Sequence, residues 1–245
     1  MDIEVLGKLF HCHSEDGLNI AFKTITADMG IERFCFFRIS NSTGEVLKAV
    51  GDYPQDWINQ YFECGYVDID PTISVGKVTA SQFTWPYVQR LFERTKALNE
   101  YWNEAASFNM SNGVSDVLFT GTNLSGLGYV LPRRESAEKW LTEHGERLRV
   151  LSTAFYQQVN QLATQSKINE LMRKLTARER ECAQWLAMGL TAAQAARKMK
   201  ISERTVRFHL EKLKFKCDVK TKEQVIVTLA YHHVIEDLNV RRNST

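Results

Sequence analysis

The chain has 245 residues, 44% hydrophobic and 24% charged, so it has room for two globular domains whose cores need no disulfide bonds. Its five cysteines are widely spaced and form no C-x-x-C pair, which argues against a disulfide framework and against a metal site. No run of 18 apolar residues occurs and the first residues do not resemble a secretory signal, so we expect a cytoplasmic protein with no membrane partner.

Charge is distributed unevenly along the chain. Residues 170–245 carry 16 lysines and arginines against 9 acids, whereas residues 1–169 carry 15 against 20. This asymmetry is typical of an acidic body joined to a basic module that binds a polyanion, although a merely solvated charged face explains the numbers equally well.

The first part of the chain predicts a mixture of helices and strands. The first 30 residues show helical spacing, a hairpin follows over Phe34–Ile39 and Val46–Val50, and a helix begins after Tyr53-Pro54. Residues 64–90 are expected to be irregular and aromatic. A helix over Glu93–Phe108 and two strands, Ser115–Thr120 and Gly126–Leu131, complete the series.

A long helix is predicted from about Glu135 to Gln165. Its apolar stripe packs in the core or forms a dimer seam, and we favour the seam; the stripe comprises Leu141, Leu148, Leu151, Phe155, Val159 and Leu162. The polar stretch 166–174 is expected to be a linker. The predicted domains are therefore 1–165 and 175–245.

Helix starts are unusually clear in the C-terminal domain. Three capping boxes occur, Thr176-x-x-Glu179, Thr191-x-x-Gln194 and Thr221-x-x-Gln224, and Ser202 is a fourth N-cap candidate. Gly189 stands where the first helix must end. Four short helices are predicted.

The third of these helices, from Ser202 to about Cys217, has one apolar and one polar face. Its Val206, Leu210 and Leu213 are expected in a core with Leu175, Leu186, Ala195, Ala196, Met199, Ile201 and Val225. Its other side chains then point outward, namely Arg204, Thr205, Arg207, Phe208, Glu211, Lys212 and Lys214. Residues 197–222 hold ten basic residues against three acids, which favours a phosphate-binding face.

The motifs L-T-x-R-E-R-E-C (175–182), W-L-A-M-G-L-T (185–191) and I-S-E-R-T-V-R-F-H-L (201–210) resemble the C-terminal helix-turn-helix domain of LuxR-type regulators. Ala183 and Gln194-Ala195 depart from the usual residues of that family. The resemblance implies that the helix from Ser202 enters the major groove of double-stranded DNA, with RNA polymerase as a further partner that such a regulator can contact.

By this resemblance Arg207 reads guanine. Glu211 accepts from a cytosine amino group or, as we favour, pairs with a neighbouring lysine. Phe208 touches a thymine methyl group or packs on its neighbours, and Arg204 lies on the same face. Contacts to the DNA backbone are expected from Thr191, Thr205, Lys212, Lys214, Lys216 and Lys222.

An aromatic cluster stands out in the first domain. Tyr53, Trp57 and Tyr61 share one helical face and are followed by Asp70-Pro71, Trp85 and Gly113. An aromatic core stripe with an Asp-Pro turn is the commoner explanation. A buried carboxylate among aromatic rings nevertheless needs a partner, and a ligand amide is one candidate.

The pattern Y-P-x-x-W-x-x-x-Y with D-P, Trp85 and Gly113 resembles the N-acyl-homoserine-lactone-binding domain of quorum-sensing regulators. The resemblance implies that Trp57 donates to the lactone carbonyl, Asp70 accepts from the amide and Tyr53 donates to the acyl carbonyl. Tyr61 and Trp85 would be apolar walls, and Gly113 would leave room nearby. Pro71 belongs to the same set, and Ser115 or Tyr129 would sense a 3-oxo group. Phe119 and Tyr129 shorten the pocket or belong to the core. The lactone is a ligand, and no cofactor is expected.

Together these features predict an α+β protein: an N-terminal α-β-α sandwich around an antiparallel sheet and a small all-α domain of four helices. It would act as a homodimer on an inverted-repeat operator. The alternatives are a LuxR-type regulator that responds to another small molecule or acts without ligand, and, less favoured, a phosphorylated receiver. No enzyme motif occurs, so no catalytic residue is expected; His11-Cys12-His13 hints at a metal but is more typical of a protein surface.

Overall fold

The computed structural model describes residues 3–119, 121–231 and 234–235, and it divides into two compact units, one up to Asn160 and one from Gln161 onward. Helix α7 (Ala137–Lys174) belongs to both. The expected end of this helix near Gln165 is therefore wrong, and the segment predicted as a polar linker, 166–174, is helical. A polar sequence without glycine or proline offers nothing that ends a helix.

The first unit is built on a five-stranded sheet in the order β2-β1-β5-β4-β3. Its strands are β1 (Arg33–Ser40), β2 (Val46–Gly51), β3 (Gln82–Thr84), β4 (Gly113–Phe119) and β5 (Asn123–Val130). All pairings are antiparallel. The predicted hairpins β1–β2 and β4–β5 are confirmed, although Thr120, at the predicted end of β4, lies outside the described residues.

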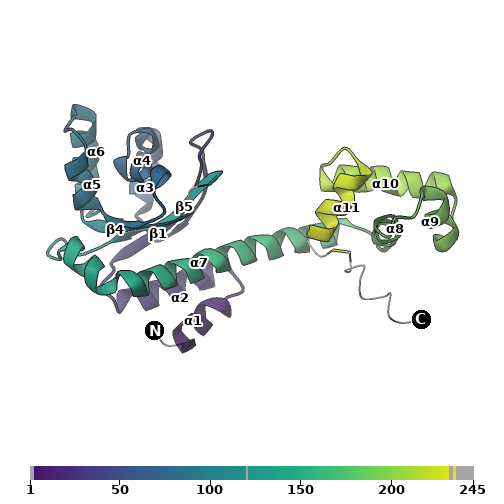
Figure 1. Ribbon diagram of the computed structural model, residues 1–245, viewed down its shortest axis with the longest axis horizontal. Helices are drawn as coiled ribbons and strands as arrows, with labels where there is room; N and C mark the ends of the chain where they lie inside the picture. The colour runs from purple at the N-terminus through teal and green to yellow at the C-terminus, as the bar shows by residue number, and fades with distance from the viewer. Residues whose placement is uncertain (1–2, 120, 232–233, 236–245) are drawn as a thin grey trace. The chain divides into compact units, whose positions relative to one another are not determined.

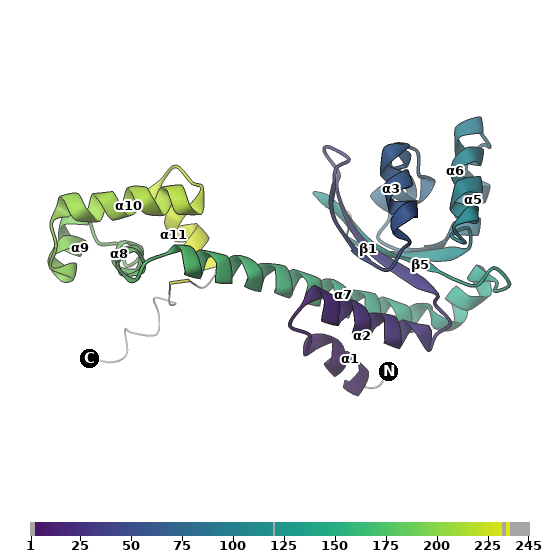
Figure 2. The same ribbon diagram turned by 180° about the vertical axis from the view of Figure 1, so that it is seen from behind.

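Helices cover both faces of this sheet, which confirms the α-β-α sandwich. On one face lie α1 (Ile3–Phe10), α2 (Glu15–Ala27) and the first part of α7, as Figures 1 and 2 show from opposite sides. On the other face lie α3 (Gln55–Glu63), α4 (Pro71–Val78), α5 (Trp85–Leu91) and α6 (Lys96–Ser107), with the short 3-10 turn η1 (Tyr66–Asp68) between α3 and α4.

The expectation that residues 64–90 are irregular is wrong, because this stretch contains η1, α4, β3 and α5. Each of its two α-helices has a side-chain cap followed by a proline within the first turn. Asp70 caps α4 before Pro71, and Thr84 caps α5, whose second residue is Pro86. Elements of three to eight residues are too short to show a periodic pattern. The caps were therefore the only signal of these helices in the sequence.

The apolar stripe of α7 packs on the sheet of its own unit. Leu148, Leu151, Phe155 and Val159 are buried, and the Phe155 ring centroid lies 4.4 Å from that of Phe22 on α2. These four side chains are therefore part of the core, and the dimer seam that was favoured for them is wrong. Leu141 and Leu162, at the two ends of the stripe, are half-buried.

The second unit contains four helices after α7, in agreement with the sequence. They are α8 (Ala177–Ala187), α9 (Ala192–Met199), α10 (Glu203–Cys217) and α11 (Lys222–Tyr231). All three capping boxes are formed, Ser202 caps α10, and Gly189 follows α8 with a φ of +83°. The predicted core residues are buried, with Ile201 and Leu210 half-buried at its edge.

Candidate functional site

A mostly apolar cavity lies in the first unit between the sheet and the helices α3 to α6. Six of the predicted ligand-binding residues line it: Tyr53, Trp57, Tyr61, Asp70, Trp85 and Ser115. The lining continues over side chains of β1, β2 and η1, among them Phe37, Ile39, Val46 and Val67. The lining therefore combines aromatic and polar side chains with aliphatic ones.

Two of the donors that the family resemblance assigned to the ligand have no acceptor among the described residues. They are the Tyr53 hydroxyl, just before α3, and the indole N–H of Trp57, one turn into that helix. The Tyr53 hydroxyl lies close to the sheet because Gly128 has no side chain; a Cβ there would lie 2.5 Å from this oxygen. Two donors directed into an apolar cavity favour a ligand that carries acceptor oxygens.

Asp70 is buried at the N-terminus of α4. Its Oδ1 accepts from the Thr72 amide at 2.8 Å and from the Thr72 hydroxyl at 2.7 Å. Its Oδ2 accepts from the Tyr61 hydroxyl at 2.9 Å. The carboxylate therefore has partners within the fold besides any ligand amide, and Tyr61 is a hydrogen-bond donor as well as an aromatic wall.

No ion pair within the described part of the chain involves Asp70. Burial consequently raises the pKa of this carboxyl group, and the hydrogen bonds from Thr72, Tyr101 and Tyr61 offset only part of the effect. The environment penalises the ionised form, so a further hydrogen-bond donor from a ligand would stabilise the carboxylate.

Tyr101 on α6 is a cavity residue that the sequence analysis missed. It is buried beside Asp70, and its ring centroid lies 5.2 Å from that of Tyr66. Burial, followed by the nearby Asp70 charge, raises the pKa of Tyr101 well above its ordinary value, so it remains a neutral phenol. Its spacing from Ala105 and Phe108 along the predicted helix was the only signal in the sequence.

Cys35 on β1 also lines the cavity and was not predicted to do so. Burial raises the pKa of its thiol to about 12. The side chain therefore contributes a small apolar surface and not a nucleophile.

Trp85 and Ser115 form a second wall of the cavity. The Trp85 indole N–H donates to Ser115 Oγ at 3.0 Å, which joins the start of α5 to β4. Gly113 does not line the cavity, but it permits this wall: a Cβ there would collide with the Tyr129 carbonyl and lie 2.8 Å from the Trp85 ring. Pro71 is buried in the first turn of α4 and is likewise outside the lining.

Of the alternatives for Tyr129, a place in the core is confirmed, and the roles of sensing a 3-oxo group or shortening the pocket are wrong. This side chain is fully buried on the opposite face of the sheet, where its hydroxyl lies 2.7 Å from Ser152 Oγ on α7. Phe119 is half-exposed at the end of β4, outside the cavity lining. Ser115 is the predicted 3-oxo sensor that does face the cavity.

In the second unit, α10 presents the polar face that the sequence predicted. Arg204, Arg207, Phe208, Glu211 and Lys212 are exposed, and Thr205 and Lys214 are half-buried. Glu203 holds the Arg207 guanidinium through two contacts, at 3.0 Å to Nε and 2.6 Å to Nη2. Both atoms belong to the planar guanidinium group that can donate two hydrogen bonds to guanine. The Glu203 carboxylate therefore either orients Arg207 for this contact or must release it when DNA binds.

The other predicted DNA-binding residues differ in their surroundings. Glu211 pairs with Lys214 at 2.7 Å, the alternative that was favoured for it, and the Lys212 ammonium lies 4.7 Å above the Phe208 ring. The Thr191 hydroxyl caps α9, and Lys222 is half-buried at the start of α11.

Lys216 is engaged within the fold. Its ammonium lies 2.6 Å from the buried Glu179 carboxylate, which also accepts from the Thr176 amide at 2.8 Å. Burial raises the pKa of Glu179, but the contacts from Lys216 and Thr176 outweigh it, and the net pKa is lowered. Lys216 therefore stabilises the second unit, and its charge is already neutralised before any phosphate arrives.

Comparison with known proteins agrees with this division of the chain. Residues 14–159 match the family model described as autoinducer binding domain, and residues 173–229 match that of bacterial regulatory proteins, luxR family. The chain belongs to the LuxR-type regulators that have an autoinducer-binding domain. This is a family of transcription regulators and not of enzymes.

Relatives match over most of their length. The chain is 27% identical to the transcriptional activator SolR of Ralstonia nicotianae, covering 83% of this chain and 86% of SolR. It is 25% identical to the activator AnoR of Acinetobacter nosocomialis, covering 89% and 92%. The crystal structure of Escherichia coli SdiA has the same fold, with a TM-score of 0.54 at 19% identity over 96% of this chain and 98% of SdiA.

A second solved structure, SdiA in complex with octanoyl-rac-glycerol, matches with a TM-score of 0.55 at 18% identity over 93% of this chain and 92% of that one.

The described part of this chain contains no helix long and apolar enough to cross a membrane. The LuxR-type regulator thus has an autoinducer-binding unit and a DNA-binding helix-turn-helix unit.

Proposed function

We propose that this LuxR-type regulator binds an N-acyl-homoserine lactone in the cavity of its first unit. Trp57 donates to the lactone carbonyl, Tyr53 donates to the acyl carbonyl, and Asp70 accepts from the amide N–H. The acyl chain lies along the aliphatic lining near Phe37, and its burial supplies most of the affinity. A 3-oxo group would meet Ser115.

One observation carries this assignment: the cavity combines Tyr53 and Trp57, two donors that have no acceptor in the described part of the chain, with a buried carboxylate, Asp70. An acyl-homoserine lactone has two carbonyls and one amide N–H, which complement these three groups. A fatty acid would place its own carboxylate near Asp70, where two anions repel.

The occupied protein then acts as a homodimer on an inverted-repeat operator. Each copy places α10 in the major groove, with Arg207 directed to guanine and Lys212 and Lys214 near phosphates. Support comes from the helix-turn-helix unit and from the exposed basic face of α10. RNA polymerase is the partner through which such a regulator would act on transcription.

Calorimetric titration of the full chain with N-octanoyl-homoserine lactone tests the ligand assignment. The matched control ligand is the same molecule with the amide N–H replaced by an ester oxygen. We expect the ester to bind about 5- to 100-fold more weakly, because Asp70 then faces an acceptor and loses its additional donor. Equal affinity for the two would contradict the role of Asp70.

A second candidate is a neutral monoacylglycerol. One observation favours it: SdiA, which matches this chain in fold, was solved with octanoyl-rac-glycerol. Its hydroxyl groups can donate to Asp70, and its ester carbonyl can accept from Tyr53. Tighter binding of octanoylglycerol than of the lactone in the same titration would favour this ligand.

A further inference from the structure

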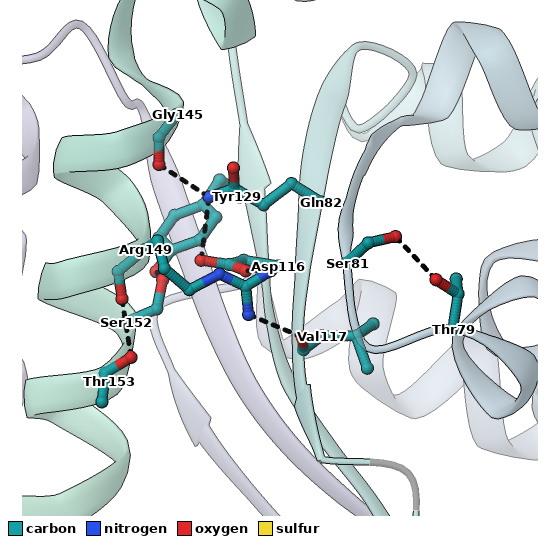
Figure 3. Close-up of polar contacts among 10 residues, drawn as sticks. All are labelled: Thr79, Ser81, Gln82, Asp116, Val117, Tyr129, Gly145, Arg149, Ser152 and Thr153. Atoms are coloured by element: carbon teal, nitrogen blue, oxygen red, sulfur yellow. Dashed lines mark hydrogen bonds and ion pairs between the residues drawn. The ribbon is translucent and has the colours of Figure 1, made fainter.

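Strand β4 carries a buried charge on the face that points away from the cavity. Successive side chains of a strand point to opposite faces, so Ser115 faces the cavity and Asp116 faces α7. Asp116 is 0% exposed. Figure 3 shows it between the strand and the helix, with Gln82 on one side and Arg149 on the other.

The contacts of Asp116 tie α7 to both strands at this edge of the sheet. Arg149 Nη2 lies 2.9 Å from Asp116 Oδ1, and Arg149 Nη1 donates to the Val117 carbonyl at 2.8 Å. Gln82 Nε2 contacts Asp116 Oδ2 at 3.1 Å and the Gly145 carbonyl at 2.8 Å (Figure 3). The helix is therefore held at two points one turn apart, Gly145 and Arg149.

The same two strands form one wall of the cavity. Gln82 and Asp116 are paired in the β3–β4 register, and the next pair along is Phe83 with Ser115. Trp85, which directly follows β3, donates its indole N–H to Ser115. A displacement of the Trp85–Ser115 wall therefore shifts the backbone that carries Gln82 and Asp116.

An ion pair with one buried partner is sensitive to such a shift, and here Asp116 is fully buried while the Arg149 side chain is 34% exposed. The attraction between Asp116 and Arg149 offsets the cost of burial only while the geometry is good, and losing one contact exposes that cost. Burial already raises the pKa of Asp116, although Ser152, Arg149 and Gln82 act in the opposite direction. A movement of the strands therefore changes how firmly α7 is held.

We propose that the Gln82–Asp116–Arg149 cluster couples the ligand cavity to helix α7, with Asp116 as a positioning residue that acts through β4. The ligand half of this coupling rests on the proposed function, whereas the link between the Trp85 wall and α7 does not. Coupling is reciprocal, so a ligand that fixes Ser115 and Trp85 fixes α7, and weakening the cluster weakens ligand binding. Because α7 continues to Lys174, it is the segment through which the cavity is connected to the DNA-binding unit.

Amide hydrogen exchange of the full chain without ligand tests the first half. Trp85→Phe removes the bond to Ser115 and keeps an aromatic ring. We expect it to speed exchange of the amides at 145–152 about 5-fold or more, with little effect on amides of α2. In Arg149→Lys, where the charge remains and the bond to Val117 is altered, those amides should already exchange fast and Trp85→Phe should add little.

Two further variants separate coupling from general destabilisation. Gln82→Met removes both contacts of the Gln82 amide and leaves the ion pair between Asp116 and Arg149. It replaces Arg149→Lys if that variant folds poorly, and we expect the same fast exchange of the amides at 145–152. Asn160→Ala removes the 2.6 Å bond from Arg38 to α7, away from β3 and β4, so the effect of Trp85→Phe should persist in it. Uniform acceleration over the whole first unit, or no change at 145–152, would overturn the proposal.

Adding N-octanoyl-homoserine lactone tests the second half. We expect slower exchange at 145–152 in the native chain and a smaller effect in Arg149→Lys. If the lactone does not bind while Trp85→Phe still acts on α7, the proposed ligand is wrong and the link from the cavity wall to α7 stands. If it binds and protects only residues around the cavity, the coupling is wrong and the proposed ligand stands.

Discussion

The hydroxyl of Tyr61 donates a 2.9 Å hydrogen bond to Asp70 Oδ2, so the carboxylate at the centre of the cavity has a donor before any ligand arrives. A ligand amide must share this oxygen with Tyr61 or displace it. The affinity for a lactone therefore reflects the difference between the Asp70 hydrogen bond to Tyr61 and the Asp70 hydrogen bond to the ligand amide. Substitutions of Asp70 and Tyr61 separate these two contributions.

Asp70→Asn should weaken lactone binding without unfolding the protein. An asparagine can still cap α4 through its oxygen, but its NH2 group opposes the ligand N–H as donor against donor. We expect the affinity for N-octanoyl-homoserine lactone to fall about 10-fold or more, measured by calorimetry. Unchanged affinity would show that the amide lies elsewhere.

The same variant should change how stability depends on pH. The pKa of Asp70 is raised in the folded state, so the stability associated with its protonated form is full below the unfolded pKa and is lost as pH rises through the folded pKa. In urea unfolding, Asp70→Asn should gain stability relative to the native chain as pH rises over that window. A constant difference at all pH values would argue against the raised pKa.

Tyr61→Phe should bind the lactone more tightly, although the ligand-free protein becomes less stable. The variant leaves Asp70 Oδ2 without this donor, which costs about 1–3 kcal/mol of unfolding free energy, and a ligand amide then restores the bond. Tyr66→Phe is the matched control, since that hydroxyl contacts Glu104 at 2.6 Å and not Asp70. Weaker lactone binding by Tyr61→Phe would mean that this hydroxyl contacts the ligand.

Two lysines of α10 should separate stability from DNA binding. Lys216→Met leaves buried Glu179 without its cation and should lower the unfolding free energy of the second unit by about 1–3 kcal/mol. The pKa of Glu179 is lowered in the fold. The difference in unfolding free energy between the native chain and Lys216→Met should therefore be full above the unfolded pKa of Glu179 and shrink as pH falls through its folded pKa.

Lys212→Met is the counterpart of that variant. Within the described part of the chain its ammonium lies over the Phe208 ring and forms no ion pair, so stability should change little. The slope of log affinity for DNA against log salt should decrease by about 1. If Lys216→Met instead changes the salt slope and leaves stability intact, its assigned role is wrong.

Arg207→Ala should weaken binding at one base position of the operator. Loss of a bidentate contact to guanine costs about 1–3 kcal/mol and should relax preference at that position alone, measured with operators substituted one base pair at a time. Lys212→Met, by contrast, should weaken all operators equally. An equal loss for every operator with Arg207→Ala would assign this side chain to the DNA backbone.

Local signals explain why the helix-turn-helix unit was predicted almost completely. Its caps lie within three residues of the amides that they accept from, so sequence alone specifies them. Lys216 shows the limit of this approach, because its partner Glu179 is 37 residues away and nothing in the sequence pairs them.

Tyr129 was assigned to the wrong face of the sheet for a physical reason. After its first residue, every position of β5 is buried. A strand that is buried on both faces shows no clear alternation of apolar and polar residues, so the sequence does not indicate which face of the sheet each side chain is on. Ser115 and Trp57, which the family resemblance assigned to the ligand, both line the cavity. The second partner of Asp70, Thr72, and the nearby Tyr101 depend on packing between α4 and α6 that no local pattern records.

The central claim is that the first unit buries an acyl-homoserine lactone on Tyr53, Trp57 and Asp70. The most direct test is mass spectrometry of small molecules released from the full chain after purification from cells supplied with a mixture of acyl-homoserine lactones and monoacylglycerols. The account predicts one lactone per chain from the native protein and clearly less from Asp70→Asn of equal folded content. Recovery of a monoacylglycerol alone, or of equal lactone from both proteins, would contradict it.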